Sequence, residues 1–339
     1  MPNKKYILDL AKEILSIPSP SGYCKKVIER IETEAKKFNL KFERTPKGNG
    51  IITIPGKDDY VVGLSAHVDT LGAMVRSISS TTLKFTSIGG PIWATMDGEY
   101  CQIHTRDGKT YTGTILSTSP AAHVYKDANS KDRKPESMEI RLDEVVKSKE
   151  DIEKLGIEVG NFISIDPKTT ITESGFIKSR FLDDKVNVAS LFGMIEYITR
   201  NKITPKHTIK IVISTFEEVG HGSSWIPEDI EEFIAVDMGC IGSDLTCTEY
   251  DVSICAKDSS GPYDYDMTSK LVELAKKNKL KYACDIYPYY GSDVSAALRG
   301  GNNIKGALIG PGVHASHGME RTHYDAIENT IKLLVEYIK

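Results

Sequence analysis

The chain has 339 residues, of which 40% are hydrophobic and 27% are charged, and its formal net charge is −4. This apolar content is enough to bury a substantial core, which excludes a disordered chain, and the length suits about two domains. The small negative charge provides no basic surface for nucleic acid or an anionic membrane, so we expect neither as a partner.

The N-terminal region and the cysteines indicate a cytoplasmic protein. Asp9, Lys12 and Glu13 interrupt the apolar run that a signal peptide needs, and no segment is apolar enough to predict a membrane span. The six cysteines are scattered without a CxxC pair, which favours reduced thiols over a disulfide framework. We therefore expect a cytoplasmic location and no cysteine nucleophile.

The N-terminal part of the sequence predicts helices followed by strands. Apolar residues recur at helical spacing in residues 7–15 and again in residues 27–35. Short strands are expected at 41–44 and 51–54. Residues 60–66 are nearly all apolar or small, which is typical of a strand buried on both faces of an α/β sheet.

The character of the sequence changes over residues 73–165, where glycine, serine and threonine are frequent. A helix is expected near 149–155, and the charged stretch 126–136 predicts an exposed loop. The remaining segments predict short strands, at 83–88, 100–105, 110–117, 138–146 and 161–166. We expect a small β-rich domain of the barrel or PDZ-like type, inserted into a catalytic domain formed by residues 1–72 and 166–339.

After the insert, the sequence returns to alternating helices and strands. Helices are expected at 185–199, 267–277 and 324–338, and strands at 208–215, 233–236, 281–286 and 304–309. The predicted fold class is therefore α/β, with a catalytic domain split by a β-rich insert.

Metal-type ligands occur where the predicted strands end, which is where functional groups gather in open α/β sheets. His67 and Asp69 follow the strand at 60–66. A carboxylate two residues after a histidine can orient its ring for metal binding. The structural alternative is a histidine that closes the strand and bonds to a neighbour.

Two pairs of acidic residues follow. Asp183 and Asp184 precede a predicted helix, where they could serve as an N-cap and a first-turn acid, or where one could bridge two cations. Glu217 and Glu218 directly follow an apolar strand, where two glutamates are costly unless their charge is compensated. One could bind metal while the other takes a proton from metal-bound water.

The last candidate ligands are an aspartate and a group of histidines. Asp237 ends the strand at 233–236, and His314, His317 and His323 lie within ten residues of one another. Two histidines and three or more carboxylates suit a site with mixed N/O ligands, which favours zinc, cobalt or manganese over a thiolate-bound metal. The sequence has no Ser/His/Asp elbow, Walker loop or dinucleotide fingerprint that would compete with this interpretation.

The order His-x-Asp, Asp-Asp, Glu-Glu, Asp, His resembles that of the glutamyl/deblocking (TET-type) aminopeptidases, a family of co-catalytic two-zinc metallopeptidases. The similarity covers nearly the whole chain, and its segments are SPSGY, HVDTLGAMV, SIGG, FLDDKV, EEVGHGS, AVDMG and GSDVSAA. The insert lies between His67 and Asp183, as in this family. In the carboxypeptidase-like relatives these two residues are close together.

The resemblance implies a three-layer zinc-peptidase catalytic domain with a mixed central sheet, and it implies a role for each candidate residue. Asp183 would bridge two divalent metal ions, zinc by expectation and cobalt or manganese as alternatives. His67 and Asp237 would complete one metal site, and Glu218 and His317 the other, with Glu217 as the general base and Asp69 as the partner of His67. His314 is the alternative to His317.

Two departures from the family pattern indicate a divergent branch. The usual Arg-Tyr-x-His-Ser is replaced here by the sequence from His314 to Gly318, and the usual Arg after the paired aspartates is Lys185. These changes bear on substrate preference more than on metal binding.

The expected function is hydrolysis of the N-terminal peptide bond of short peptides by a homo-oligomer, with the insert contributing to assembly or substrate access. One alternative is a related two-metal amidohydrolase, either an N-acyl amino acid deacylase or a carboxypeptidase. Another is a metal-free peptide-binding scaffold of the same fold.

Overall fold

The computed structural model describes all residues, 1–339. The apolar segment predicted to be a buried strand forms β3 (Asp58–His67), in the interior of a ten-stranded sheet. The other strands of this sheet are β1 (Lys41–Arg44), β2 (Gly50–Ile54), β12 (His207–Ser214), β13 (Glu232–Val236), β14 (Gly239–Cys240), β15 (Val252–Asp258), β16 (Gly261–Pro262), β17 (Tyr282–Ile286) and β18 (Lys305–Val313).

The sheet is mixed, as predicted. Its strand order is β1-β2-β12-β3-β13-β18-β15-β16, with β14 paired to β18 and β17 paired to β15. Strand β3 is parallel to both of its neighbours, β12 and β13, and β13 is parallel to β18. Strands β2 and β15 pair antiparallel to β12 and β18. The carboxyl ends of β3, β12 and β13 therefore meet at one edge.

Helices cover both faces of this sheet and produce the expected three layers. The helices are α1 (Lys4–Leu15), α2 (Lys25–Lys37), α4 (Leu182–Arg200), α5 (Tyr265–Lys277), α6 (Asp293–Arg299) and α7 (Tyr324–Ile338). Successive side chains of a strand point to opposite faces: in β13, Ile234 and Val236 belong to the core shared with α1, α4 and α7, while Phe233 and Ala235 pack with Val294 of α6.

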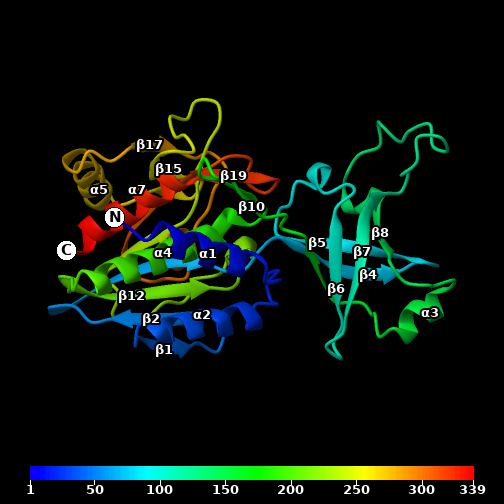
Figure 1. Ribbon diagram of the computed structural model, residues 1–339, viewed down its shortest axis with the longest axis horizontal. Coiled ribbons are helices and arrows are strands. Elements are labelled where there is room, and N and C mark those ends of the chain that lie inside the picture. Colours follow the sequence, from blue (N-terminus) through cyan, green and yellow to red (C-terminus); the bar gives the residue numbers. More distant parts are fainter.

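Helix α4 lies at the centre of one helical layer. It packs against α1 and α7 on its sides and against β3 beneath (Figure 1). Its residues from Leu182 to Ile195 are all buried, including the charged residues Asp183, Asp184 and Lys185 at its start.

A closed six-stranded barrel forms the second lobe of the molecule (Figure 1). Its core contains the fully buried side chains of Phe85, Ile103, Ile140 and Ile163. In order around the barrel, the strands are β4 (Gly72–Ile78), β5 (Thr82–Ile88), β8 (Met138–Leu142), β7 (Thr110–Ser117), β6 (Tyr100–His104) and β9 (Phe162–Ile165). The short helix α3 (Lys149–Lys154) lies between β8 and β9.

The structure also contains a three-stranded sheet with the order β10-β11-β19. Its strands are β10 (Thr170–Ile171), β11 (Phe176–Ser179) and β19 (Glu320–His323). This sheet was not predicted, because its strands are short and polar. Strands β4 and β15 and helix α6 were also missed. Helix α6 has only 7 residues, too few to display a helical period. None of the helices combines the length and the apolar character that crossing a bilayer requires.

Candidate metal centre and active site

Three strand ends bring the predicted ligands together. His67 is the last residue of β3 and is paired in register with Ser214, the last residue of β12. The glutamates that follow β12 therefore begin beside His67. Asp237 follows β13, the other parallel neighbour of β3.

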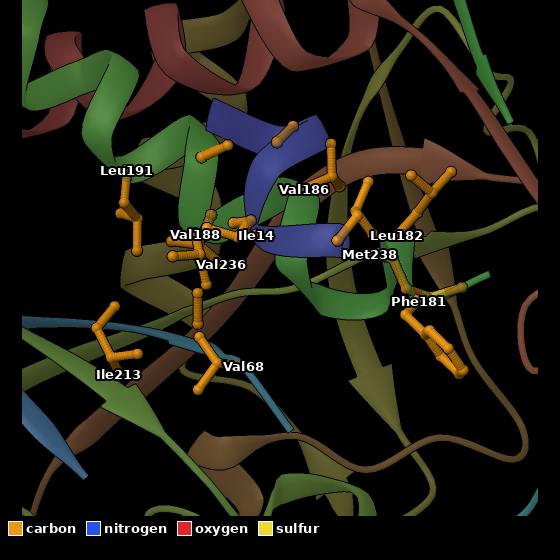
Figure 2. Packing of buried hydrophobic residues seen from close by; sticks show 14 of the residues in the cluster. Ile14, Val68, Phe181, Leu182, Val186, Val188, Leu191, Ile213, Val236 and Met238 are labelled. Atoms are coloured by element: carbon orange, nitrogen blue, oxygen red, sulfur yellow. The ribbon is translucent and has the colours of Figure 1, made fainter. Parts of the chain in front are cut away.

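Buried apolar neighbours hold these polar residues in place. Val68, Leu182, Val236 and Met238 are each at most 1% exposed and adjoin predicted ligands in the chain. Figure 2 shows these side chains within the hydrophobic cluster. Because moving a ligand would pull its neighbour out of a close-packed core, the ligand positions are fixed by packing.

Asp183 lies between the two histidines. Its Oδ1 is 3.0 Å from Nε2 of His67, and its Oδ2 is 3.7 Å from Nε2 of His317. The two oxygens of one carboxylate thus face two different imidazoles, which suits a group shared by two cations.

The two glutamates extend this arrangement. Glu218 Oε2 is 3.7 Å from Nε2 of His317, and Glu217 Oε2 is 3.6 Å from Nε2 of His67. His67, Asp183 and Glu218 offer ligand atoms that all lie within 4.8 Å of one another. The predicted ligands other than His67 line a cavity of about 230 Å³, formed by Asp183, Glu217, Glu218, Gly220, Asp237, Tyr289, Tyr290, Gly291, Ser292, Arg299 and His317.

Asp69 contacts His67 through its backbone, which differs from the expected carboxylate contact. The ring Nδ1 of His67 is 2.9 Å from the carbonyl oxygen of Asp69 and 3.6 Å from Oδ1. The carboxylate instead accepts the backbone N–H groups of Glu217 and Glu218, at 3.1 and 3.2 Å, and the hydroxyl of Ser21 at 2.6 Å. Asp69 therefore fixes both the histidine ring and the glutamate turn.

Asp184, the second of the paired aspartates, is completely buried beside the site. It forms a second compact group with His67 and Asp237, with ligand atoms within 4.8 Å. Its Oδ2 accepts the backbone N–H of His67 at 3.1 Å, and its Oδ1 accepts the side-chain amide of Asn187 at 2.6 Å. Both oxygens of Asp184 accept hydrogen bonds, so this carboxylate holds the backbone of His67 in place.

Glu320 is a buried residue beside the candidate ligands that sequence reasoning missed. It is 2% exposed, and its two oxygens accept the backbone N–H groups of Asp183 and His317, each at 3.0 Å. His317 has a φ of 63°, in the left-handed region that costs non-glycine residues energy. The hydrogen bond that the N–H of His317 donates to Glu320 helps to offset this cost. No local sequence signal marks Glu320 for this role.

The remaining expectations concern the surroundings of the site. His314 pairs with Arg321 through the backbone and does not line the cavity, which His317 does. Residues 289–292 form part of the cavity wall. Tyr263 lies behind this wall, and its hydroxyl contacts Asp258 and Ser292, each at 2.8 Å.

The site concentrates buried negative charge. Burial, together with neighbouring carboxylates, raises the pKa of Glu217 and Glu218 well above the usual range and that of Asp237 to about 7. Burial alone would lower the pKa of His67, but Asp183, Glu217 and Asp69 raise it well above its usual value. No lysine or arginine pairs with Glu217, Glu218 or Asp237, and the two glutamates contact the imidazoles of His67 and His317 instead.

The donor set fits divalent cations. Oε1 of Glu218 is buried and has no hydrogen-bond partner, which is costly for a carboxylate oxygen unless a cation binds it. Imidazole nitrogens and carboxylate oxygens are the ligands that zinc, cobalt and manganese share. No thiol lines the cavity, so the donor atoms available there are nitrogen and oxygen.

The chain is similar to known aminopeptidases. The sequence model of the M42 glutamyl aminopeptidases matches residues 48–333. The protein named "Putative aminopeptidase YhfE" of Bacillus subtilis is 49% identical over 342 residues, covering 100% of this chain and 99% of that protein. The lysyl aminopeptidase of Pyrococcus furiosus is 28% identical over 235 residues, covering 68% of this chain and 66% of its own.

Solved structures with the same fold include a TET aminopeptidase from a marine-sediment Thaumarchaeota archaeon, with a TM-score of 0.89 and 19% identity, covering 99% of this chain and 97% of that one. The TET1 peptidase of Pyrococcus horikoshii has a TM-score of 0.85 at 22% identity, covering 98% of this chain and 99% of its own. The predicted fold class is confirmed. The match over most of the chain and the near-complete relative show that this chain belongs to the M42 glutamyl aminopeptidase family and is a peptide hydrolase.

Proposed function

We propose that the chain is an aminopeptidase that holds two divalent metal ions, zinc in the first instance, and hydrolyses the N-terminal peptide bond of short peptides. In this proposal Asp183 bridges the ions, His67 and Asp237 complete one site, and Glu218 and His317 complete the other. The observation that carries it is the placement of Asp183, whose two oxygens face His67 and His317 separately.

The bound cations would supply Lewis-acid polarisation of the scissile carbonyl and a lowered pKa for water. Glu217 is the general base: it accepts a proton from the attacking water and donates it to the leaving amine. Its carboxylate lines the cavity beside Asp183, and the N–H of Glu217 donates to Asp69. If Nδ1 of His67 donates to the Asp69 carbonyl, the lone pair of Nε2 points toward Asp183.

The surroundings of the active centre are part of the proposal. We place the protein in the cytoplasm because all six cysteines are free thiols. We also propose a homo-oligomer in which the barrel lobe contributes contacts, because the TET1 peptidase of Pyrococcus horikoshii, of the same fold, can assemble into a tetrahedron or a large octahedral shell.

A panel of substrates tests the proposed reaction. We expect hydrolysis of aminoacyl-p-nitroanilides and of dipeptides with a free N-terminus, and at least about 100-fold lower kcat/KM for their N-acetylated forms, because the free amine is needed for binding. Initial rates with zinc, cobalt or manganese added in turn measure this. Faster cleavage of N-acyl amino acids, or release of the C-terminal residue from N-blocked peptides, would instead support the deacylase or the carboxypeptidase.

Variants of the two neighbouring histidines test the assignment of the late ligand. His317→Ala is expected to reduce bound metal from two ions per chain toward one and to lower kcat/KM at least about 100-fold, because loss of an inner ligand weakens metal binding more than loss of an outer partner does. His314→Ala is the matched control and is expected to retain both ions. Mass spectrometry measures the number of metal ions bound to each variant. Loss of metal from His314→Ala but not from His317→Ala would show that His314 is the ligand.

A further inference from the structure

The cavity contains one cationic side chain other than a histidine, Arg299, among the four carboxylates of Asp183, Glu217, Glu218 and Asp237. Arg299 makes no ion pair and no side-chain hydrogen bond, although acids line the same cavity. An arginine free of partners beside an acidic cavity retains all five N–H donors for a ligand.

The backbone that carries Arg299 is fixed to the active-site loop at both ends of α6. At the start of the helix, Asp293 accepts the hydroxyl of Ser214 at 2.7 Å and the N–H of Ser223 at 2.8 Å. Both partners lie in the segment that contains Glu217.

At the end of the helix, Gly300 lies so close to the carbonyl oxygen of Ser224 that an added Cβ would be 2.0 Å from it. The side-chain amide of Asn302 donates to the same oxygen at 3.2 Å and to the carbonyl of Ala297 at 2.8 Å. The backbone of Arg299 therefore keeps a constant position relative to the loop of the proposed general base, and its exposed side chain remains free to bind a ligand at the cavity.

We infer that Arg299 is a specificity residue that binds a carboxylate of the peptide held in the cavity, an inference that rests on the proposed aminopeptidase function. The guanidinium fork matches a carboxylate in two parallel hydrogen bonds, and the acidic cavity walls would repel that carboxylate elsewhere. The carboxylate has two sources: the side chain of an acidic first residue, or the C-terminus of a short peptide.

Two substrate pairs separate these sources. L-Glutamyl- and L-glutaminyl-p-nitroanilide differ only in the charge of the first side chain, and Leu-Gly and Leu-Gly-amide differ only at the C-terminus. Arg299→Gln is expected to raise KM about 10-fold or more for the charged member of one pair, the scale of a lost charge-assisted interaction. The KM of the neutral member should change by less than about twofold.

Arg299→Lys, which retains the charge without the fork, is expected to lose less than Arg299→Gln. Arg76→Gln removes an exposed arginine of β4 that also has no ion pair, and it serves as the matched control with unchanged kinetics for both pairs. An effect confined to the glutamyl pair supports the side-chain source, and one confined to the dipeptide pair supports the C-terminal source.

Equal losses on charged and neutral members, or no loss at all in Arg299→Gln, would overturn the inference while leaving the aminopeptidase proposal intact. An unmutated enzyme inactive on all four substrates would instead reject the proposed function. Thermal melting curves of each variant establish that the exposed substitutions leave the fold unchanged.

Discussion

Glu217→Gln is expected to lower kcat about 100- to 10,000-fold, the usual contribution of a positioned general base. Glutamine has nearly the same shape but cannot accept the proton of the attacking water. Its backbone N–H can still donate to Asp69, so the turn should keep its geometry. Steady-state rates on an aminoacyl-p-nitroanilide, with saturating metal, measure the effect.

The control for Glu217→Gln is the same substitution at the neighbouring glutamate, Glu218→Gln. Glu218→Gln removes the carboxylate near His317, so it should reduce bound metal as well as rate, whereas Glu217→Gln should keep two ions per chain. Near-native turnover by Glu217→Gln would show that another group takes the proton. Loss of metal from both variants alike would make Glu217 a ligand.

Removal of metal is expected to abolish activity and to lower the melting temperature. With no cation present, burial and the neighbouring carboxylates disfavour the ionised forms of Glu217, Glu218 and Asp237, whose pKa values are raised for these two reasons. A ligand that binds only the folded state stabilises it by mass action, about 2.7 kcal/mol at a concentration 100 times its Kd. Dialysis against a chelator, followed by calorimetry and activity assays, tests this.

Re-addition of zinc, cobalt or manganese should restore both activity and melting temperature, and native mass spectrometry should count two ions per chain. Calcium is the control, because it takes six to eight oxygen ligands and suits a site with histidines poorly. A thoroughly chelated protein that keeps full activity would reject the metal-dependent mechanism. Metal far below one ion per chain in protein purified without chelator would favour the peptide-binding scaffold.

Much of this protein could be predicted from local sequence signals. The apolar segment at 60–66 predicts the central strand β3, because a strand buried on both faces carries little polarity. The glutamates after β12 and the aspartate after β13 stand out because charged residues rarely follow such apolar strands directly. The order of the candidate ligand motifs along the chain was enough to indicate the family, which the comparisons confirm.

Local signals could not reveal the contacts between distant segments. Helix α6 was missed because it is short, and with it the buried Asp293 that ties the helix to the loop of Glu217. Glu320 was overlooked among three histidines because its role consists of two hydrogen bonds to backbone groups, one of them 137 residues away in the chain. Neither residue has a spacing that marks it.

The sequence alone determined which side chains are available for metal chemistry, at which strand ends they occur, and that a β-rich segment separates His67 from Asp183. Only the tertiary structure decided how they meet: which oxygen of Asp183 faces which histidine, that Asp69 contacts His67 through its carbonyl, and that Arg299 enters the cavity unpaired. The reason is physical, because residue type and burial leave local patterns in a chain, whereas distances between segments depend on the packing of the whole core.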